Sequence, residues 1–137
     1  MTSYDVAQLG GLDTWLQAGD RPGKQFVDKL IPTQYIGVSA NATAPGDQSP
    51  FWHSHDRIEE VYVFLGGVGQ MGLDDEVVDV QPGTVVRVGQ GVMRILRALP
   101  DSPEDLRWMC IRAGGDTLEN VGHDGALDRE RPAPWAE

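Results

Sequence analysis

The chain has 137 residues, a length that suits one domain with a single hydrophobic core. Its formal net charge of −10 repels nucleic-acid backbones and anionic lipid surfaces, which excludes both classes as expected partners. No run of about 20 apolar residues predicts a membrane span, and the first residues do not resemble a secretory signal. The single cysteine, Cys110, cannot form an intrachain disulfide, so we expect a cytoplasmic protein.

The 17 glycines and 9 prolines favour many short strands separated by turns over long helices. Residues 1–32 mix polar and apolar side chains without clean alternation, which predicts an N-terminal arm packed outside the main fold. Residues 114–137 are polar and contain proline, which predicts a short C-terminal tail. Residues 33–113, between these two segments, are expected to form the folded barrel.

Eight strands are expected in this central part, because runs of β-branched and aromatic residues alternate there with turns rich in Gly, Pro and Asp. Many short strands at close spacing are typical of an all-β sandwich or barrel. The expected strands cover residues 35–42, 51–55, 59–65, 68–73, 76–80, 84–88, 93–99 and 106–112.

Two histidines and a following carboxylate make residues 52–60 the segment with the strongest functional signal. Side chains alternate along a strand, so His53 and His55 point to one face and can both reach a single ion. After a turn, the chain is expected to return as the antiparallel partner of this strand, with a carboxylate beside the two imidazoles. Two imidazoles and one carboxylate suit iron, zinc, manganese, nickel or copper.

Two acids, Glu59 and Glu60, are candidates for that carboxylate, and periodicity alone does not choose between them. Alternation along the strand places Glu60 on the same face as Tyr62 and Phe64. Two large aromatic side chains suit the lining of a barrel, which is compatible with Glu60 as the site residue.

The same segment resembles the first motif of the cupin family, in which HxH precedes a Glu and then a Gly at defined spacing. Here His53 and His55 stand four residues before Glu60, and Gly67 follows after six more residues. In cupins with paired acids at this place the second acid usually binds the metal, so the resemblance implies Glu60. It also implies an all-β jelly-roll barrel with a metal or a ligand at its centre.

The second cupin motif is only partly retained. Its glycine spacing is kept at positions 83, 89 and 91, whereas Arg94 replaces its His and Ala98 replaces its Asn. A guanidinium is always protonated and cannot bind a metal. At an effective dielectric constant near 20, a positive charge about 4.5 Å from a divalent ion costs on the order of 7 kcal/mol.

Two interpretations of Arg94 follow. In the first, His53, His55 and Glu60 hold a metal, and Arg94 reaches into the pocket to fix a substrate anion by a bidentate contact. In the second, no metal binds and Arg94 pairs with Glu60 or with Glu59.

The predicted function is a metal-dependent cupin enzyme that acts on a small, anionic organic molecule, with Glu60, Arg94 and Tyr62 as catalytic residues. Oxygenation, isomerisation and cyclisation are all open. One alternative is a metal-free cupin that binds a small molecule without catalysis. Another is an acid–base enzyme that uses Glu59, Glu60 and Tyr62 without metal. A homodimer formed through the N-terminal arm is also expected.

Several other residues are weaker candidates. His123 would complete the ligand set if the tail folded over the barrel, although a solvated turn explains it more simply. Cys110 is expected to be a small core residue because no histidine is near it in sequence. Arg87 and Arg97 are expected at the surface.

Overall fold

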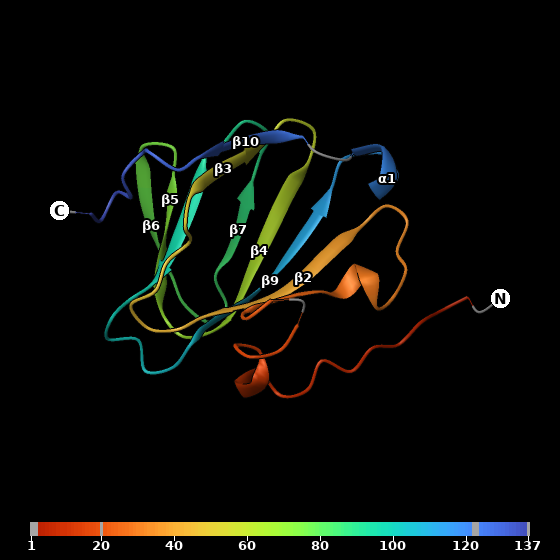
Figure 1. The fold of residues 1–137 in the computed structure, drawn as a ribbon, viewed down its shortest axis with the longest axis horizontal. Helices are drawn as coiled ribbons and strands as arrows, with labels where there is room; N and C mark the ends of the chain where they lie inside the picture. Colours follow the sequence, from red (N-terminus) through yellow and green to blue (C-terminus); the bar gives the residue numbers. More distant parts are fainter. Residues whose placement is uncertain (1–2, 20, 122–123, 137) are drawn as a thin grey trace.

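The computed structural model describes residues 3–19, 21–121 and 124–136. The chain forms two five-stranded antiparallel sheets that pack face to face (Figure 1). One sheet has the order β1-β2-β9-β4-β7 and the other has the order β10-β3-β8-β5-β6. The strands are β1 (Lys24–Phe26), β2 (Gly37–Thr43), β3 (Trp52–His55), β4 (Glu59–Gly66), β5 (Gly69–Leu73), β6 (Glu76–Val80), β7 (Val85–Val88), β8 (Arg94–Ala98), β9 (Leu106–Ala113) and β10 (Gly125–Asp128).

Strands β2 to β9 are the eight expected strands, and each end lies within two residues of its predicted position. Their arrangement in the two sheets is the jelly-roll order, which confirms the predicted fold class. β1 and β10 were not expected. They lie in the segments predicted as arm and tail, and each adds an edge strand to one sheet. Both are short and lack an alternating apolar pattern, so the sequence gives no strand signal there.

The jelly roll is not closed into a continuous barrel, because no strand of one sheet pairs with a strand of the other among the described residues. β6 and β7 are consecutive in the chain, yet they are edge strands of different sheets. The chain crosses between them through a tight turn in which the Thr84 N–H donates to the Gln81 carbonyl. Pro82, inside this turn, has no N–H to continue a ladder. The architecture is therefore a jelly-roll sandwich.

The main core fills the space between the sheets. It receives side chains from both inner faces because residues two apart on a strand share one face. Its buried members are Tyr62, Phe64, Met71, Val80, Val88, Leu96, Ala98, Leu106, Trp108 and Cys110.

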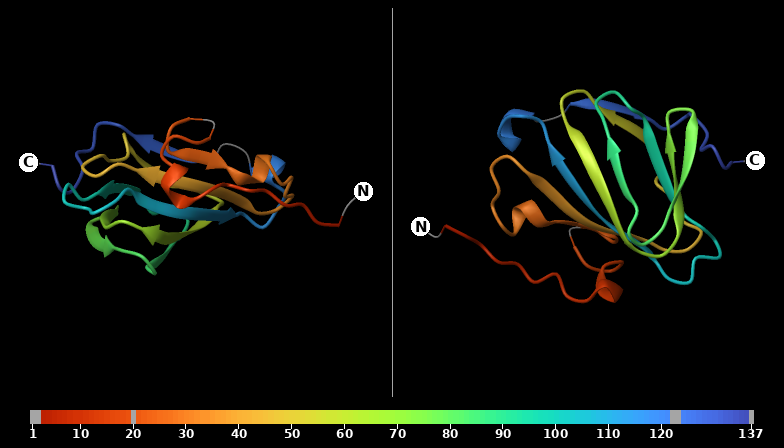
Figure 2. Two further views of the ribbon diagram at one scale, coloured as in Figure 1. Left: turned by 90° about the horizontal axis from the view of Figure 1, so that it is seen from below. Right: turned by 180° about the vertical axis from the view of Figure 1, so that it is seen from behind.

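A second apolar cluster lies on the outer face of the sheet that contains β2. Trp15 and Val27, from the N-terminal segment, pack there against Ala40 and Ala42 of β2. The N-terminal segment runs along the outside of this sheet (Figure 2). Two 3₁₀ turns, Leu12–Thr14 and Val27–Lys29, shape it, and the short helix α1 (Leu118–Val121) follows β9. No helix in the described ranges has the length and apolar character needed to cross a bilayer.

The end of the chain covers the outside of β3. The Trp52 side chain is buried there, and its Nε1 donates to the Pro132 carbonyl at 3.2 Å. The Arg131 guanidinium lies 4.1 Å from the centroid of the same indole ring. The expected tail is thus attached to the fold both by strand pairing through β10 and by these contacts.

Candidate functional site

His53 and His55 lie on one face of β3, as predicted, with their ring centroids 5.3 Å apart. We expected the carboxylate to come from a strand paired with β3, and this expectation was wrong. β4 belongs to the opposite sheet, and Glu60 faces the two histidines across the sandwich. The site therefore forms between the sheets, where each contributes side chains from its inner face.

Glu60, and not Glu59, is the carboxylate of this site. Its Oε1 lies 4.0 Å from His53 Nε2 and its Oε2 lies 3.8 Å from His55 Nε2. One donor atom from each of these three residues lies within 4.8 Å of the others. Glu59 points to the outer face, where Arg87 Nε donates to its Oε2 at 2.9 Å. An acid–base mechanism that uses Glu59 is therefore not supported.

Arg94 is fully buried and pairs with Glu60, as the second interpretation of this residue proposed. Its Nη2 lies 2.5 Å from Glu60 Oε1, and its Nη1 donates to the Val92 carbonyl at 2.9 Å. Burial raises the pKa of Glu60, but the charge of Arg94 and its hydrogen bond lower it more, so the net pKa lies below the usual range. Arg94 does not line the adjoining cavity, so direct contact with a substrate anion is not supported.

Tyr62 and Cys110 stand beside Glu60 on the inner face of the same sheet. Tyr62 donates its hydroxyl hydrogen to Glu60 Oε1 at 3.0 Å, and burial together with the Glu60 charge raises its pKa well above the usual value. Burial and the Glu60 charge also raise the pKa of the Cys110 thiol. Both groups therefore keep their protons near neutral pH, and neither is a base or a nucleophile in this state.

His55 is held by a carboxylate from the C-terminal segment. Asp124 Oδ1 lies 3.0 Å from His55 Nδ1, and Asp124 Oδ2 accepts from the backbone N–H groups of Arg57 and Ile58. Burial raises the pKa of Asp124, but these hydrogen bonds lower it more, so the carboxylate is ionised and accepts. Asp124 therefore favours a hydrogen on His55 Nδ1, and in a neutral ring this arrangement leaves the Nε2 lone pair on the side of Glu60.

The three ligand candidates fit a divalent transition metal. Burial, followed by the charge of Arg94, lowers the pKa of His53 to about 4, so its ring is neutral near pH 7. Arg94 and Tyr62 both donate to Oε1 of Glu60, and its Oε2 lies 3.8 Å from His55 Nε2. Two imidazole nitrogens and one carboxylate oxygen are therefore available, and these are donors that zinc, iron and related metals accept.

A cavity of about 380 Å³ adjoins the site. Phe26, Phe51, Tyr62, Leu96 and Trp108 give it apolar walls. The polar lining consists of Arg21, Lys24, Ser39, Asn41, Ser49, His53, His55, Glu60, Cys110 and Arg112.

Sequence reasoning missed Asp124 and the three cationic residues of this cavity, Arg21, Lys24 and Arg112. Arg21 and Lys24 lie in the segment predicted as an outer arm, and no motif marks them. Asp124 stands beside His123, the weaker ligand candidate, which lies outside the described residues.

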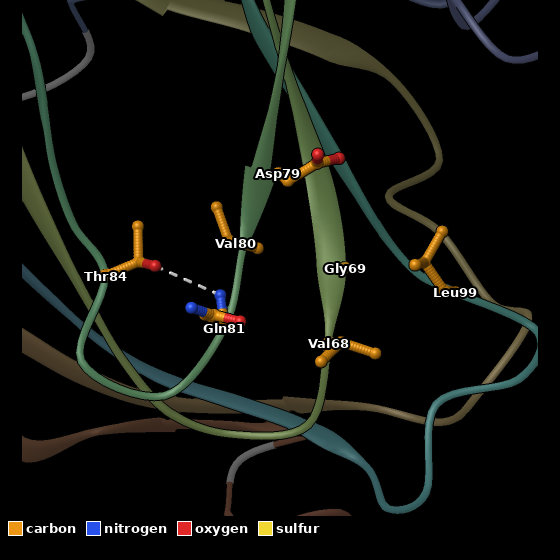
Figure 3. Close-up of a pocket in the computed structure, with 7 residues that line it drawn as sticks. All are labelled: Val68, Gly69, Asp79, Val80, Gln81, Thr84 and Leu99. Carbon is orange, nitrogen blue, oxygen red and sulfur yellow. Dashed lines mark hydrogen bonds between the residues drawn. The ribbon is translucent and has the colours of Figure 1, made fainter.

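A second cavity, of about 430 Å³, lies at the opposite end of the sheet that contains β5 (Figure 3). Asp79 is its only titratable lining residue among those described, and the Asp79 carboxylate accepts a hydrogen bond from Gln70. No described His, Cys or second acid lines it, so it lacks the metal-binding chemistry of the first cavity.

Asp124→Asn is expected to weaken binding of a divalent metal about 10- to 100-fold. The new amide can still accept from the backbone through its oxygen, but its NH₂ group would face His55 Nδ1. The His55 hydrogen would then move to Nε2 and block the lone pair needed by a metal. Metal affinity is measured by competition with a chelator. Asp56→Asn, which removes the same charge from the exposed turn, is the control, and equal affinities for the two variants would contradict this role.

No protein-family model and no curated protein matches the sequence. Among solved structures, a cupin protein from Bacteroides fragilis matches with a TM-score of 0.71 and 25% identity, over 84% of this chain and 87% of that chain. A conserved protein from Klebsiella pneumoniae with a double-stranded beta-helix domain matches with a TM-score of 0.66 and 16% identity, over 90% and 98%. A structure of DMSP lyases matches with a TM-score of 0.55 and 20% identity, over 69% and 44%.

Three findings point to the same superfamily. The structural neighbours are cupin and double-stranded beta-helix proteins, the strands have the jelly-roll order, and the motif residues His53, His55 and Glu60 lie together between the sheets. This chain is a member of the cupin superfamily.

Proposed function

We propose that the chain is a metal-dependent cupin enzyme that acts on a small organic molecule bound in the cavity beside His53, His55 and Glu60. The observation that carries the proposal is the convergence of three donor atoms within 4.8 Å, with the Nδ1 atom of His55 hydrogen-bonded to the Asp124 carboxylate. A structural neighbour named as DMSP lyases is compatible with catalysis on this fold.

When bound, the metal would act as a Lewis acid or an oxygen activator for a ligand in the cavity. Glu60 Oε2 and the Nε2 atoms of the two histidines would hold it. Arg94 and Tyr62 would fix the Glu60 carboxylate through Oε1 and keep Oε2 on the side of His55. The aromatic walls would exclude water from the bound molecule and strengthen electrostatic interactions there. Oxygenation, isomerisation and cyclisation all suit this arrangement.

Protein purified without a nickel column is expected to bind about one equivalent of a divalent transition metal. His53→Ala/His55→Ala should bind none, because a single carboxylate cannot hold the ion. Metal content is measured by elemental analysis after supplementation and desalting, and circular dichroism checks the fold. Glu59→Gln, on the outer face, is the control and should bind as the wild type does. Wild-type protein that stays metal-free after supplementation would overturn the proposal.

A metal-free binding protein is the second candidate, and one observation favours it. The charge of Glu60 is already compensated by Arg94, at 2.5 Å, so the buried carboxylate needs no metal for its stability. In that case the cavity would bind its ligand equally well before and after treatment with a chelator. The same elemental analysis decides between the two candidates.

A further inference from the structure

Positive charge collects at the end of the cavity formed by β1 and β2. Arg21, Lys24 and Arg112 all line it, although the chain as a whole carries a net charge of −10. The net negative charge of the protein repels anions from most of its surface. A cavity lined by three cations is therefore a place where an anion can bind.

The strand register explains how a lysine of the N-terminal segment reaches the inner face. Lys24 pairs with Asn41 of β2, and Asn41 pairs with Trp108 of β9. Directly paired residues of antiparallel strands share a face, so Lys24 lies on the same side as Asn41 and Trp108. All three line the cavity. β1 thus extends the concave face of the sheet by one strand and places an ammonium group at its edge.

Two of these cations have no acidic partner in the described part of the chain. Arg112 Nη2 lies 3.3 Å from Asp28 Oδ1, so its charge is compensated. No described carboxylate lies within 4.0 Å of Lys24 Nζ or of the Arg21 guanidinium, whereas the Phe26 ring centroid is 5.3 Å from Lys24 Nζ. Burial is the main cause that lowers the pKa of Lys24, and the charges of Arg21 and Arg112 add to it, while Cys110 and Glu60 act in the opposite direction without reversing the shift. A bound anion would relieve both effects.

We propose that Lys24, assisted by Arg21, binds the carboxylate of a small organic ligand whose other end faces His53, His55 and Glu60. This inference rests on the proposed function in that it takes the cavity beside these residues to be the ligand site. Arg94, which the sequence suggested as the anion-binding residue, is paired with Glu60, so the ligand carboxylate would instead bind to Lys24 on the edge strand β1. The aromatic walls would contact the apolar body of the ligand, and the ammonium would select its charged end.

The test compares benzoate with its neutral isostere benzamide in titrations followed by two-dimensional amide NMR of chelator-treated protein. Benzoate at millimolar concentrations should shift resonances of β1 and β2 and bind more tightly than benzamide. Lys24→Gln should weaken benzoate binding about tenfold, the loss of one charge-assisted hydrogen bond, and leave benzamide binding unchanged. Lys29→Gln, at the other lysine of the chain, which does not line the cavity, should bind benzoate as the wild type does.

Equal binding of benzoate and benzamide by the wild type would overturn the inference. So would unchanged benzoate affinity in Lys24→Gln, or the absence of benzoate shifts on β1 and β2. The amide spectrum of each variant shows whether it is folded. Because the protein is free of metal in this titration, its result is independent of metal binding. Metal content of Lys24→Gln, which keeps all three ligand candidates, should equal that of the wild type, so a failure of the proposed function is seen separately.

Discussion

Arg94→Met is expected to lower the free energy of unfolding by about 3–5 kcal/mol. Arg94 and Glu60 are both buried, with their charged atoms 2.5 Å apart, and methionine replaces the arginine with an unbranched, uncharged side chain. The Glu60 carboxylate would then lose its charged partner and keep only neutral ones, Tyr62 and Cys110, while remaining out of water. An unpaired buried charge is far more costly than the loss of the attraction alone, which gives this substitution its large effect.

The measurement is urea denaturation followed by tryptophan fluorescence. Arg87→Met is the matched control, since it breaks the exposed pair with Glu59 and should cost less than about 1 kcal/mol. The double variant Arg94→Met/Glu60→Gln should recover most of the lost stability, because no buried charge is left without a partner. A cost for Arg94→Met no greater than that of Arg87→Met would show that the buried pair does not have this role.

Arg94→His is expected to increase the affinity for a divalent metal by at least about 100-fold. His53 pairs directly with position 94, so a side chain at this position lies on the same inner face as the His53 ring. The substitution removes a positive charge from the Glu60 carboxylate and supplies a further imidazole donor. Repulsion between a guanidinium and a divalent ion at such distances is several kcal/mol, and each 1.4 kcal/mol is a factor of ten in affinity.

Competition with a chelator measures this affinity in the wild type and the variant. Arg87→His is the control, because it exchanges the same residue types on the outer face of β7 and should leave metal binding unchanged. Equal affinities for Arg94→His and the wild type would mean that position 94 does not take part in the metal site, despite its contact with Glu60.

The fold was largely predictable because it depends on local signals. Alternating apolar residues and Gly- or Pro-containing turns located all eight jelly-roll strands, and alternation alone placed His53 and His55 on one face. The pairing partner of a strand is not a local property, so our prediction that the strand of Glu60 pairs with the strand of the histidines was wrong. Family resemblance, and not periodicity, selected Glu60 over Glu59.

The parts of the site that escaped prediction come from distant segments of the chain. Asp124 contacts His55 across 69 positions of sequence, and Lys24 reaches the cavity only because β1 pairs with β2. Neither belongs to a strand with an apolar pattern or to a recognised motif. The role of Arg94 was open because its side-chain partner depends on packing between the two sheets, which spacing along the chain does not specify.

The link between Asp124 and the β3–β4 turn also bears on when the site can form during synthesis. Asp124 accepts hydrogen bonds from the backbone of Arg57 and Ile58 while it holds the His55 ring. His53, His55 and Glu60 leave the ribosome before Asp124, so they lack this support until the segment that contains Asp124 has emerged and β10 has added to β3. In the proposed metal site, loading is therefore expected to follow the synthesis of the segment that contains Asp124 and β10.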